Sequence, residues 1–505
     1  MVKYAVISVS DKKNILPFAR GILRFNYKII ATGNTATLLN KNNIDCINVQ
    51  NYTNFPEIFS GRVKTLHPKI FGGILQRPDI KGDIAEATKN NINPIEIICV
   101  NLYPFSQVVK RDDVSHEVKI ENIDIGGPSL IRAAAKNYKF VSVLTNSNQY
   151  EEFLTELESG EISIQTKQRL AYEAFAHTSN YDTKIADYFE NEFNQSKSFF
   201  RVNEPLYKEL RYGENPHQKG FLFGNFNEYF DVLHGKELSY NNIMDLSAGY
   251  ELVNEFEPVS CAIIKHSNPC GAAYADNVFN AYKRALAGDP VSAFGGIVVF
   301  NDKVDAKTAT LMDEIFLEII CAHEFDTDAL QILKKKKNRR LIKSFPGKLS
   351  NRYLFKNLYG GIVMQEFDNS KIDDGNLRLV SARKISQSEK EDLIFAWKVC
   401  KHTKSNSIVY VKNNTCIGVG AGQMSRVDSV KIGANKAKEF GHELNGAVVA
   451  SDAFFPFADN IHELAKNGVT AVIQPGGSVR DEEVIRAVDN NNISMIFTGI
   501  RNFKH

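Results

Sequence analysis

Hydrophobic and polar positions alternate in blocks over roughly the first 150 residues of the chain. Apolar runs with the composition of buried strands are separated by stretches in which apolar residues recur at helical spacing. Ser10-Asp11 supplies N-cap chemistry for the first of these helices. The alternation predicts an α/β fold with a parallel sheet covered on both faces. Its strands are expected at Tyr4–Val9, Lys28–Ala31, Ile95–Val100 and Phe140–Leu144.

Residues 151–195 have a helical pattern, and the polar stretch Asn194–Ser198 that follows is the best candidate linker. We therefore expect one domain over 1–196 and a second region over 197–505. In the second region, apolar strands again run into Gly-rich or polar loops. A short echo of five residues, Gly295–Val299 against Gly360–Met364, hints at a duplicated α/β unit.

Composition and charge narrow the function classes. A length of 505 residues favours about three domains, and 43% apolar with 24% charged residues is ordinary for a globular chain. The net charge of +2 gives no support for a general nucleic-acid surface, because no excess of cations exists to neutralise phosphates. One charge run, Lys334–Arg340, is expected to be a solvated helix end or loop, with a targeting or nucleic-acid role as the minor alternative.

The seven cysteines form no C-x-x-C pair, so neither a disulfide framework nor a Cys-rich zinc site is expected. The N-terminus enters a strand without a basic region and a long apolar segment, so no signal peptide is expected. No run of about 20 apolar residues suited to a bilayer occurs. The expected location is a reducing cytoplasm, with no metal and no membrane or nucleic-acid partner.

Thr32-Gly33-Asn34-Thr35 follows the second expected strand and opens a helix. Gly permits close approach of the backbone, the hydroxyls can donate, and a helix N-terminus favours an anion, so this turn is a candidate phosphate site. A tight turn with a capping Thr explains it equally well. The sequence has neither a G-x-x-x-x-G-K-[ST] motif nor a G-x-G-x-x-G motif after the first strand, so ATP and dinucleotide binding lack their usual fingerprints.

Four polar side chains of the first region lie at the ends of expected elements, namely Lys64, Tyr103, Asp124 and Lys136. Lys64 belongs to Gly61–Pro68, whose three potential cations suit an anionic ligand but also suit a solvated basic loop. Each of the four can be structural. Together they favour a polar pocket.

Lys265-His266 is the strongest catalytic candidate of the second region. The apolar run Ala262–Ile264 leads to it, and the Asn-Pro and Gly that follow are expected to force a turn. The pair places a cation beside the side chain whose usual pKa is near neutrality, at a strand end, where α/β sheets commonly bind ligands. A surface Lys beside a His satisfied by the backbone is the plain alternative.

Longer motifs occur in a fixed order along the chain, at Ser8–Lys12, Gly61–Pro68, Arg211–Gln218, Lys265-His266 and Ser451–Phe457. In this order they resemble the bifunctional purine-biosynthesis family that joins phosphoribosylaminoimidazolecarboxamide (AICAR) formyltransferase to IMP cyclohydrolase. The resemblance implies a methylglyoxal-synthase-like N-terminal cyclohydrolase domain and a C-terminal transformylase region of cytidine-deaminase-like α/β units. It also implies 10-formyltetrahydrofolate as co-substrate, no catalytic zinc, and a homodimer.

The resemblance also implies roles for individual residues. The implied catalytic residues are Lys64, Tyr103, Asp124 and Lys136 for ring closure and Lys265 and His266 for formyl transfer. Nucleotide-binding positions are implied at Ser10, Lys12, Thr32, Gly33, Thr35, Arg62 and Thr65 in the first site and at Arg211, Tyr212, Asn406, Phe454, Asp459 and Arg501 in the second. The folate side is implied at Ser425, Arg426, Pro456, Phe457 and Asn460.

The expected chemistry follows from the two reactions. The attacking amine of AICAR is conjugated with the ring and the carboxamide, so it is a poor nucleophile and needs a base, for which His266 is the natural candidate. Lys265 can stabilise charge that develops on the formyl oxygen. In ring closure, Tyr103 and Lys64 can donate to the oxygen while Asp124 orients the amide.

Two other function classes fit the sequence less well. A zinc-dependent nucleobase deaminase needs a His/Cys/Cys ligand set with a catalytic Glu, and that signature is absent. A non-enzymatic nucleotide-binding protein would not need both a Lys-His pair and a second, cationic Tyr/Asp site.

Overall fold

The structure is a computed structural model that describes residues 2–195, 199–347, 353–372, 375 and 377–505. It divides into two compact units, Met1–Asn203 and Glu204–His505, which are described separately. The expected linker Asn194–Ser198 lies partly outside the described residues. The division falls after it because Arg201 still pairs with Asp187 of the first unit, with 3.2 Å between Nε and the carboxylate.

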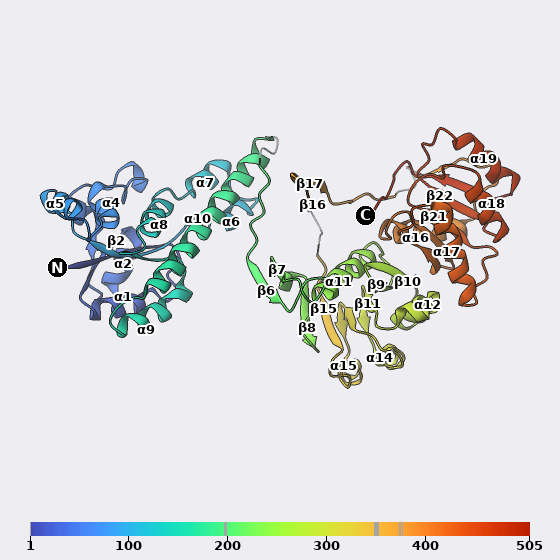
Figure 1. Cartoon of the computed structure of the whole chain (residues 1–505), viewed down its shortest axis with the longest axis horizontal. Helices are drawn as coiled ribbons and strands as arrows, with labels where there is room; N and C mark the ends of the chain where they lie inside the picture. Colours follow the sequence, from blue (N-terminus) through green and yellow to red (C-terminus); the bar gives the residue numbers. More distant parts are fainter. Residues whose placement is uncertain (1, 196–198, 348–352, 373–374, 376) are drawn as a thin grey trace. The chain divides into compact units, whose positions relative to one another are not determined.

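A five-stranded parallel sheet forms the centre of the first unit, in the order β3-β2-β1-β4-β5 (Figure 1). Its strands are β1 (Lys3–Val9), β2 (Tyr27–Ala31), β3 (Ile47–Asn48), β4 (Ile95–Asn101) and β5 (Ser142–Leu144). All except the short β3 correspond to apolar runs predicted from the sequence. The predicted parallel sheet of the first domain is therefore confirmed.

The helices of the first unit are α1 (Ile15–Arg24), α2 (Gly33–Lys41), α3 (Val49–Thr53), α4 (Pro68–Leu75), α5 (Lys81–Lys89), α6 (Phe105–Val109), α7 (His116–Glu121), α8 (Gly126–Lys136), α9 (Tyr150–Glu158) and α10 (Ile164–Glu192). On one face of the sheet α1 packs with α9, where the rings of Phe18 and Tyr150 stack with their centroids 4.6 Å apart. On the other face α4, α8 and α10 pack together (Figure 1).

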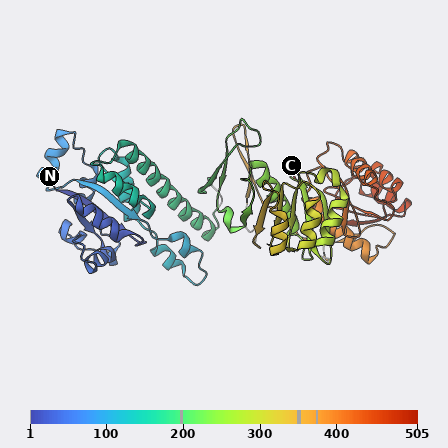
Figure 2. The ribbon, with the colours of Figure 1, turned by 90° about the horizontal axis from the view of Figure 1, so that it is seen from below.

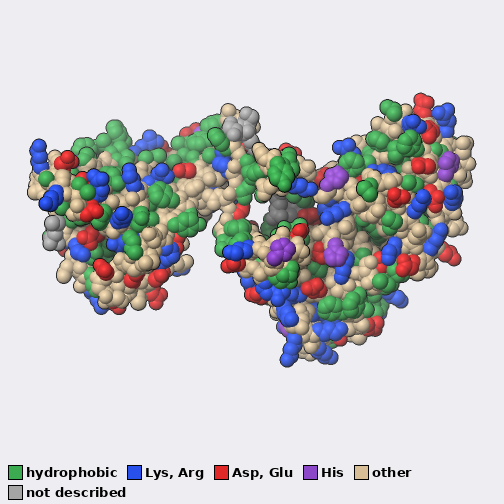
Figure 3. Space-filling model, in the orientation of Figure 1, with side chains coloured by type: hydrophobic (Ala, Val, Ile, Leu, Met, Phe, Trp, Pro, Cys, Tyr) green, Lys and Arg blue, Asp and Glu red, His purple; other side chains and the backbone are tan. Residues whose placement is uncertain are grey.

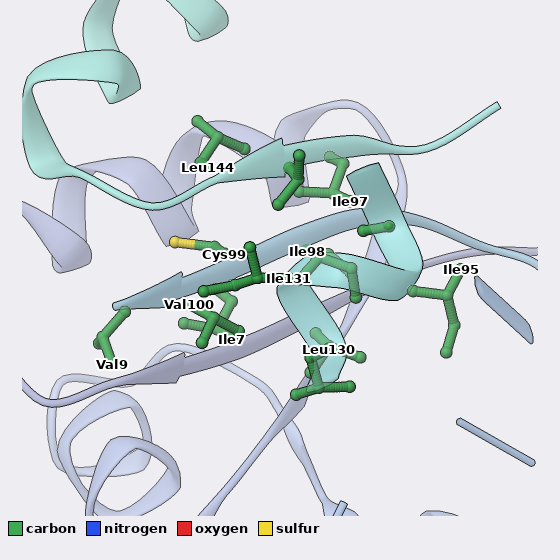
Figure 4. Close-up of a cluster of buried hydrophobic side chains, with 14 of the residues drawn as sticks. Ile7, Val9, Ile95, Ile97, Ile98, Cys99, Val100, Leu130, Ile131 and Leu144 are labelled. Atoms are coloured by element: carbon green, nitrogen blue, oxygen red, sulfur yellow. The ribbon is translucent and has the colours of Figure 1, made fainter. Parts of the chain in front are cut away.

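The core around β4 shows how alternation along a strand assigns side chains to faces. Cys99 points toward α9, because its Sγ lies 3.3 Å from the Tyr150 hydroxyl. Ile98 and Val100 therefore point to the opposite face, where α8 supplies Leu130 (Figure 4). All of these side chains are buried. Burial on both faces explains why β4 is a continuous apolar run and fixes α8, whose amino end adjoins a candidate loop.

The second unit is built on one mixed sheet in the order β18-β23-β22-β21-β19-β20-β10-β9-β11-β13-β15-β8. Its strands are β8 (Phe230–His234), β9 (Ser260–Lys265), β10 (Asn268–Tyr274), β11 (Ile297–Phe300), β13 (Ile319–Ala322), β15 (Arg340–Ser344), β18 (Arg378–Leu379), β19 (Ile408–Lys412), β20 (Thr415–Gly420), β21 (Val448–Ser451), β22 (Ala471–Gln474) and β23 (Ser494–Phe497). This mixed sheet and the helices below confirm the predicted α/β class.

The helices of the second unit are α11 (Tyr240–Val253), α12 (Val278–Gly288), α13 (Pro290–Ala293), α14 (Ala306–Asp313), α15 (Thr327–Leu333), α16 (Gln387–Lys401), α17 (Arg426–Glu439), α18 (Asp459–Lys466) and α19 (Asp481–Asn490). Figure 2 shows α14 and α15, in yellow, side by side along the sheet. The remaining strands form two-stranded sheets, in which β6 (Leu206–Leu210) pairs with β7 (Gly220–Phe223), β12 (Lys303–Val304) with β14 (Glu324–Phe325), and β16 (Tyr353–Leu358) with β17 (Gly361–Glu366).

The two halves of the large sheet repeat one strand pattern. In the first half, the pairs along β10-β9-β11-β13-β15 are antiparallel, antiparallel, parallel and parallel. The pairs along β20-β19-β21-β22-β23 in the second half follow the same pattern. The halves join at β10 and β20, where Ala273 pairs with Thr415. The second unit is therefore a duplicated α/β unit joined into one sheet.

Only one copy of the short sequence echo that suggested this duplication lies within the duplicated strands. Ile297 begins β11, whereas Gly360-Gly361 lies at the turn of the separate hairpin β16–β17. The counterpart of β11 in the second half is β21, which no Gly-Gly pair precedes. The duplication is one of strand order and direction, and a match of five residues was too short to locate it.

The Lys334–Arg340 run is only partly solvated. It follows α15, but Arg339 and Arg340 are 1% and 5% exposed. Arg339 pairs with Asp313 at 2.8 Å and Arg340 with Glu318 at 3.1 Å, and these pairs compensate the two buried charges. Over the face drawn in Figure 3, Lys and Arg side chains are otherwise interspersed with Asp and Glu, in agreement with the small net charge.

Gly420 of β20 is required because α17 approaches it backbone to backbone. A Cβ on Gly420 would lie 1.9 Å from the carbonyl oxygen of Ser429. Gly420→Ala should therefore lower the free energy of unfolding of the second unit by about 1–3 kcal/mol. The single tryptophan, Trp397, is buried in this unit, so its fluorescence during urea unfolding reports the loss.

The matched control is Gly361→Ala, because nothing lies within 4 Å of the added Cβ. Its unfolding midpoint should equal that of the native chain. Equal midpoints for the Gly420 and Gly361 variants would contradict the close approach of α17.

Candidate functional site

The first group of candidate residues lies where β1, β2 and β4 end at the carboxyl edge of the parallel sheet, a common place for ligands. The hydroxyl oxygens of Ser8 and Thr32, at the ends of β1 and β2, are 2.8 Å apart. The Lys12 ammonium donates to the Val9 carbonyl and, at 3.0 Å, to the Thr35 hydroxyl. Burial lowers the pKa of Lys12, although a neighbouring carboxylate acts in the opposite direction.

Asn101, the last residue of β4, fixes the loop that follows β1. Its side-chain oxygen accepts hydrogen bonds from the backbone N–H groups of Ser10, at 2.5 Å, and Asp11, at 3.1 Å. Its amide donates to the Asp11 carbonyl at 2.9 Å. The loop that carries Ser10 and Lys12 is thereby tied to the end of a neighbouring strand.

The Thr32–Thr35 turn lies beside Lys64. Thr32 is the N-cap of α2, the helix begins at Gly33, and no side chain caps it. The Lys64 ammonium is 3.8 Å from the position that a Cβ on Gly33 would occupy. A lysine ammonium and the amino end of a helix therefore converge, and together they favour a bound anion at this point.

Lys64, Tyr103 and Asp124 are brought together next to this turn. Burial raises the pKa of Asp124, while the backbone N–H groups of Gly127 and Tyr103 and the charge of Lys64 act against that shift. The Gly127 N–H donates to Asp124 Oδ1 at 2.8 Å. Lys64 lies 3.8 Å from the partly exposed Glu57 carboxylate, a loose pair that leaves its ammonium available to a ligand.

Tyr181 of α10 supports Asp124, a role that the sequence did not reveal. Its hydroxyl accepts a hydrogen bond from the Asp124 N–H at 2.7 Å and donates to the Asn122 carbonyl at 3.3 Å. Its ring is buried beside Phe105, as its helical spacing predicts for a core residue. Helical spacing predicts only that the ring is buried. It does not predict the partner of the hydroxyl, which belongs to a loop far away in the sequence.

Two residues implied for the first site are not brought to it. Lys136 is exposed at the carboxyl end of α8, ten residues of helix and about 15 Å from the end that adjoins Asp124. Arg62 is exposed and forms a bidentate pair with Glu121. Thr65, in contrast, is buried and its hydroxyl faces Gly126.

The second group begins at the turn between β9 and β10. His266 and Ser267 are its two residues, with φ angles of 51° and 60°, and Lys265 pairs with Asn268 next to it. The sequence-based expectation placed the turn at the Asn-Pro and Gly, and this is wrong, because Asn268-Pro269 already lies in β10. Two residues suffice because both adopt the left-handed conformation of a type I′ turn.

Contacts on both sides of this turn connect it to other loops. The Lys265 ammonium donates to the Phe294 carbonyl at 2.9 Å. On the other strand, the side-chain oxygen of Asn268 accepts from the Lys404 N–H at 2.9 Å. The turn therefore lies between the loop that precedes β11 and the loop that precedes β19.

Arg426 is buried between the second of these loops and the end of β21. Its guanidinium donates to the Asp452 carboxylate, to the Ser451 hydroxyl at 2.9 Å and to the Asn406 side-chain oxygen at 2.8 Å. The Ser405 hydroxyl donates to the other Asp452 oxygen at 2.5 Å. In this structure the donors of Arg426 are thus directed at protein oxygens and hold Asn406 in place.

The C-terminal segment lies against the same cluster. The Asn502 N–H donates to the Asp452 carbonyl and the Ser405 N–H to the Lys504 carbonyl, both at 2.9 Å. Arg501, between them and the last strand, is exposed. The segment thus presents Arg501 beside the loop that carries Asn406.

The Ser451–Phe457 motif exposes aromatic surface. Phe454 and Phe457 are 37% and 47% exposed, and the Arg480 guanidinium lies 4.7 Å from the centre of the Phe457 ring. Asp459 is exposed and accepts at 2.7 Å from the buried amide of Asn460. Exposed rings beside polar groups suit a flat ligand with polar edges.

Arg211 and Tyr212 are placed differently. They directly follow β6, with the guanidinium 5.3 Å from the centre of the Tyr212 ring. They lie near Arg340, whose pKa is lowered first by burial and further by Arg211. Within the described residues, no hydrogen bond joins this pair to Asn406.

Two cavities, of about 320 and 210 Å³, lie outside both groups of candidate residues. The larger is lined by Arg284, Lys412 and His442 among others. Over the described ranges, no three His, Cys, Asp or Glu side chains are placed to hold a metal ion. In the same part of the chain, no helix has both the length and the apolar character needed to cross a membrane.

Comparison with known proteins gives consistent matches. An MGS-like domain matches residues 14–129, and the AICARFT/IMPCHase bienzyme family matches residues 134–436. The "Bifunctional purine biosynthesis protein PurH" of Persephonella marina is 46% identical and covers 100% of both chains. The protein of the same name from Aquifex aeolicus is 47% identical over 99% of this chain and 100% of its own.

A solved structure titled "Crystal structure of ForH" is 33% identical over 37% of this chain and 100% of its own, with a TM-score of 0.35, an overlap too small to support a structural argument. The full-length relatives and the matched family carry the assignment instead. The chain belongs to the AICAR formyltransferase/IMP cyclohydrolase bienzyme family of purine biosynthesis.

Proposed function

We propose that the first unit closes formyl-AICAR to IMP and that the second transfers the formyl group to AICAR. The family combines the two activities, and the chain has a separate group of candidate residues in each unit. One observation carries this division. Lys64, Tyr103 and Asp124 lie together within the first unit, whereas His266 belongs to a turn of the second unit and Lys265 precedes it.

The nucleotide phosphate of the first site binds at the amino end of α2. The N–H groups of its first turn and the ammonium groups of Lys12 and Lys64 supply the positive potential there. The other proposed nucleotide-binding positions are Ser10, Thr32, Gly33, Thr35, Arg62 and Thr65. Arg62 must exchange Glu121 for the substrate, because the two are paired in this structure.

In ring closure, the carboxamide nitrogen attacks the formyl carbon, and the resulting carbinolamine loses water. Lys64 and the exposed Tyr103 hydroxyl donate to the formyl oxygen as charge develops on it. Asp124 accepts from the carboxamide N–H, and the raised pKa of its partly buried carboxyl suits a group that exchanges a proton. We assign Lys136 no role in ring closure, because it lies at the far end of α8.

In formyl transfer, the AICAR amine attacks the formyl carbon of 10-formyltetrahydrofolate. His266 takes the amine proton, the bond from the formyl carbon to N10 breaks, and N10 gains a proton to give tetrahydrofolate. Lys265 stabilises the charge on the formyl oxygen. The nucleotide lies against Arg211, Tyr212, Asn406, Phe454, Asp459 and Arg501, and the folate against Ser425, Arg426, Pro456, Phe457 and Asn460.

We further expect a homodimer that acts in the cytoplasm and needs no metal. The hairpin β16–β17 supports an association, because Leu354, Leu358, Ile362 and Val363 on its two strands are between 44% and 56% exposed. A lone two-stranded hairpin is marginally stable, and an exposed apolar patch favours a protein partner. The alternative of a zinc-dependent deaminase has no support from the family match.

His266→Ala should lower kcat for formyl transfer by about 10²–10⁴-fold, because the amine loses its base. Closure of formyl-AICAR by the same preparation should be unchanged. Formation of tetrahydrofolate and of IMP, followed separately, checks both statements. His442→Ala, which removes a histidine outside the group, is the control, and near-native transfer by the His266 variant would exclude the proposed base.

The two units should also work apart, since the buried core of the first consists of its own residues alone. A 1–203 fragment keeps Arg201 with its partner and should convert formyl-AICAR to IMP without transferring a formyl group. A 204–505 fragment should transfer the formyl group without closing the ring. If a folded 1–203 fragment failed to close the ring, the assignment of the ring-closure site to the first unit would be wrong.

Asp124→Asn should abolish ring closure and change the pH dependence of stability. Burial raises the pKa of Asp124 in the folded chain, so the folded state binds its proton more readily than the unfolded state does. The stability that this carboxyl contributes is therefore lost as pH rises from about 3.9 through the folded pKa. Urea unfolding of the 1–203 fragment should show the variant gaining stability relative to the native fragment over that range, and a constant difference would contradict the shift.

A further inference from the structure

The backbone of the β9–β10 turn needs external support. His266 and Ser267 both have φ in the left-handed region, at 51° and 60°. Two-residue turns of this kind favour Asn and Gly, because other residues pay a conformational cost there. Neither residue is one of these, so the contacts around the turn must hold the backbone in this conformation.

Asp245 of α11 supplies the main contact. Its Oδ1 accepts a hydrogen bond from the Ser267 N–H at 2.7 Å and from the Ser267 hydroxyl at 3.3 Å. Asn268 adds a weaker bond from its amide to the His266 carbonyl at 3.3 Å. One carboxylate oxygen therefore holds the residue that directly follows the proposed base.

The second repeat also contains a hairpin turn that is held by an Asp carboxylate, but this turn carries no candidate catalytic residue. There the turn residues are Asn413 and Asn414, with φ angles of 53° and 57°. Asp392 of α16 accepts from their two N–H groups at 2.9 Å and 2.6 Å. Asp245 and Asp392 are each the sixth residue of a helix that begins with a capping box.

The repeat therefore shows that this carboxylate is a device of the fold that fixes a hairpin turn. The two turns are far apart, because β10 runs antiparallel to β20 and its seven residues, about 20 Å, separate them. In the second repeat, Asn residues already favour the left-handed backbone. In the first, the turn carries His266 and depends on the carboxylate.

We propose that Asp245 is a positioning residue for formyl transfer, which holds the His266-Ser267 turn so that the imidazole reaches the attacking amine. The proposal rests on the role of His266 proposed above. Misplacement of a catalytic group by about 1 Å can cost roughly 100-fold in rate, so loss of this support should appear in kcat. The contacts of the Asp245 carboxylate are to Ser267 of the turn, so the KM for AICAR should be unaffected.

The test is steady-state kinetics of the full chain carrying Asp245→Ala. We expect kcat for formyl transfer to fall about 10–100-fold, with the KM for AICAR and the rate of ring closure within about twofold of native. Asp245→Asn keeps an oxygen that can accept from the Ser267 N–H, so it should retain more activity than the Ala variant. Because the Asn variant changes no volume, it also tests the proposal if the Ala variant folds poorly.

Asp392→Ala is the matched control, since it removes the same contact from the other turn. It should leave kcat for formyl transfer near native, and hydrogen exchange should accelerate only in its own hairpin. In the Asp245 variant, exchange should accelerate in residues 260–274 instead. Equal losses of kcat in the two variants would show a general structural effect and overturn the proposal.

A double variant separates this proposal from the role of His266. If Asp245 acts through the imidazole, Asp245→Ala should cost nothing further in a His266→Ala background. A full additional loss in that background, or native kcat in the single Asp245 variant while His266→Ala is inactive, would overturn the positioning role alone. Native transfer by His266→Ala would instead overturn the proposed base.

Discussion

The second unit depends on a hydrophobic core that its two halves share, to which a buried ionic contact between the halves adds. Backbone pairing between the halves is short, at Ala273 and Thr415. A further contact between the halves is ionic, because Glu255 accepts from Lys401 at 2.8 Å and lies 3.0 Å from a His402 ring nitrogen. Burial acts to raise the pKa of Glu255, but these partners lower it to about 2. Because separation would leave an unpaired charge in the interior, the halves keep one arrangement.

That arrangement matters because the proposed transformylase site draws on both halves. His266 comes from the first repeat, whereas Asn406 and Phe454 come from the second. The bond from Asn268 to the Lys404 N–H passes directly between the two sets. The first unit needs no such joint, because Lys64 and Asp124 both belong to one unit built on a single parallel sheet.

The sequence predicted the parts that depend on local pattern. Long apolar runs located the strands of the first unit, and contiguous motifs marked Lys64 and Lys265-His266 as candidates. Contacts between distant segments were beyond it. Three such contacts leave no periodic signal in the sequence. They are the hydrogen bond between the Asp124 N–H and Tyr181, the pairing of Arg339 with Asp313 and the support of Ser267 by Asp245. The turn was misplaced for a related reason, since an Asn-Pro dipeptide suggests a turn more strongly than His-Ser does.

The two hairpin turns of the second unit need the same left-handed backbone, but their residues differ in how readily they adopt it. Asn413-Asn414 adopts this backbone readily, so sequence change at that turn is limited mainly by the need to keep the hairpin folded. His266-Ser267 adopts the same backbone against its own preference. Replacement by Asn or Gly would relax the hairpin and remove the imidazole at the same time. Selection for a more stable chain would therefore favour Asn or Gly at this turn, whereas selection for the proposed base would retain His266.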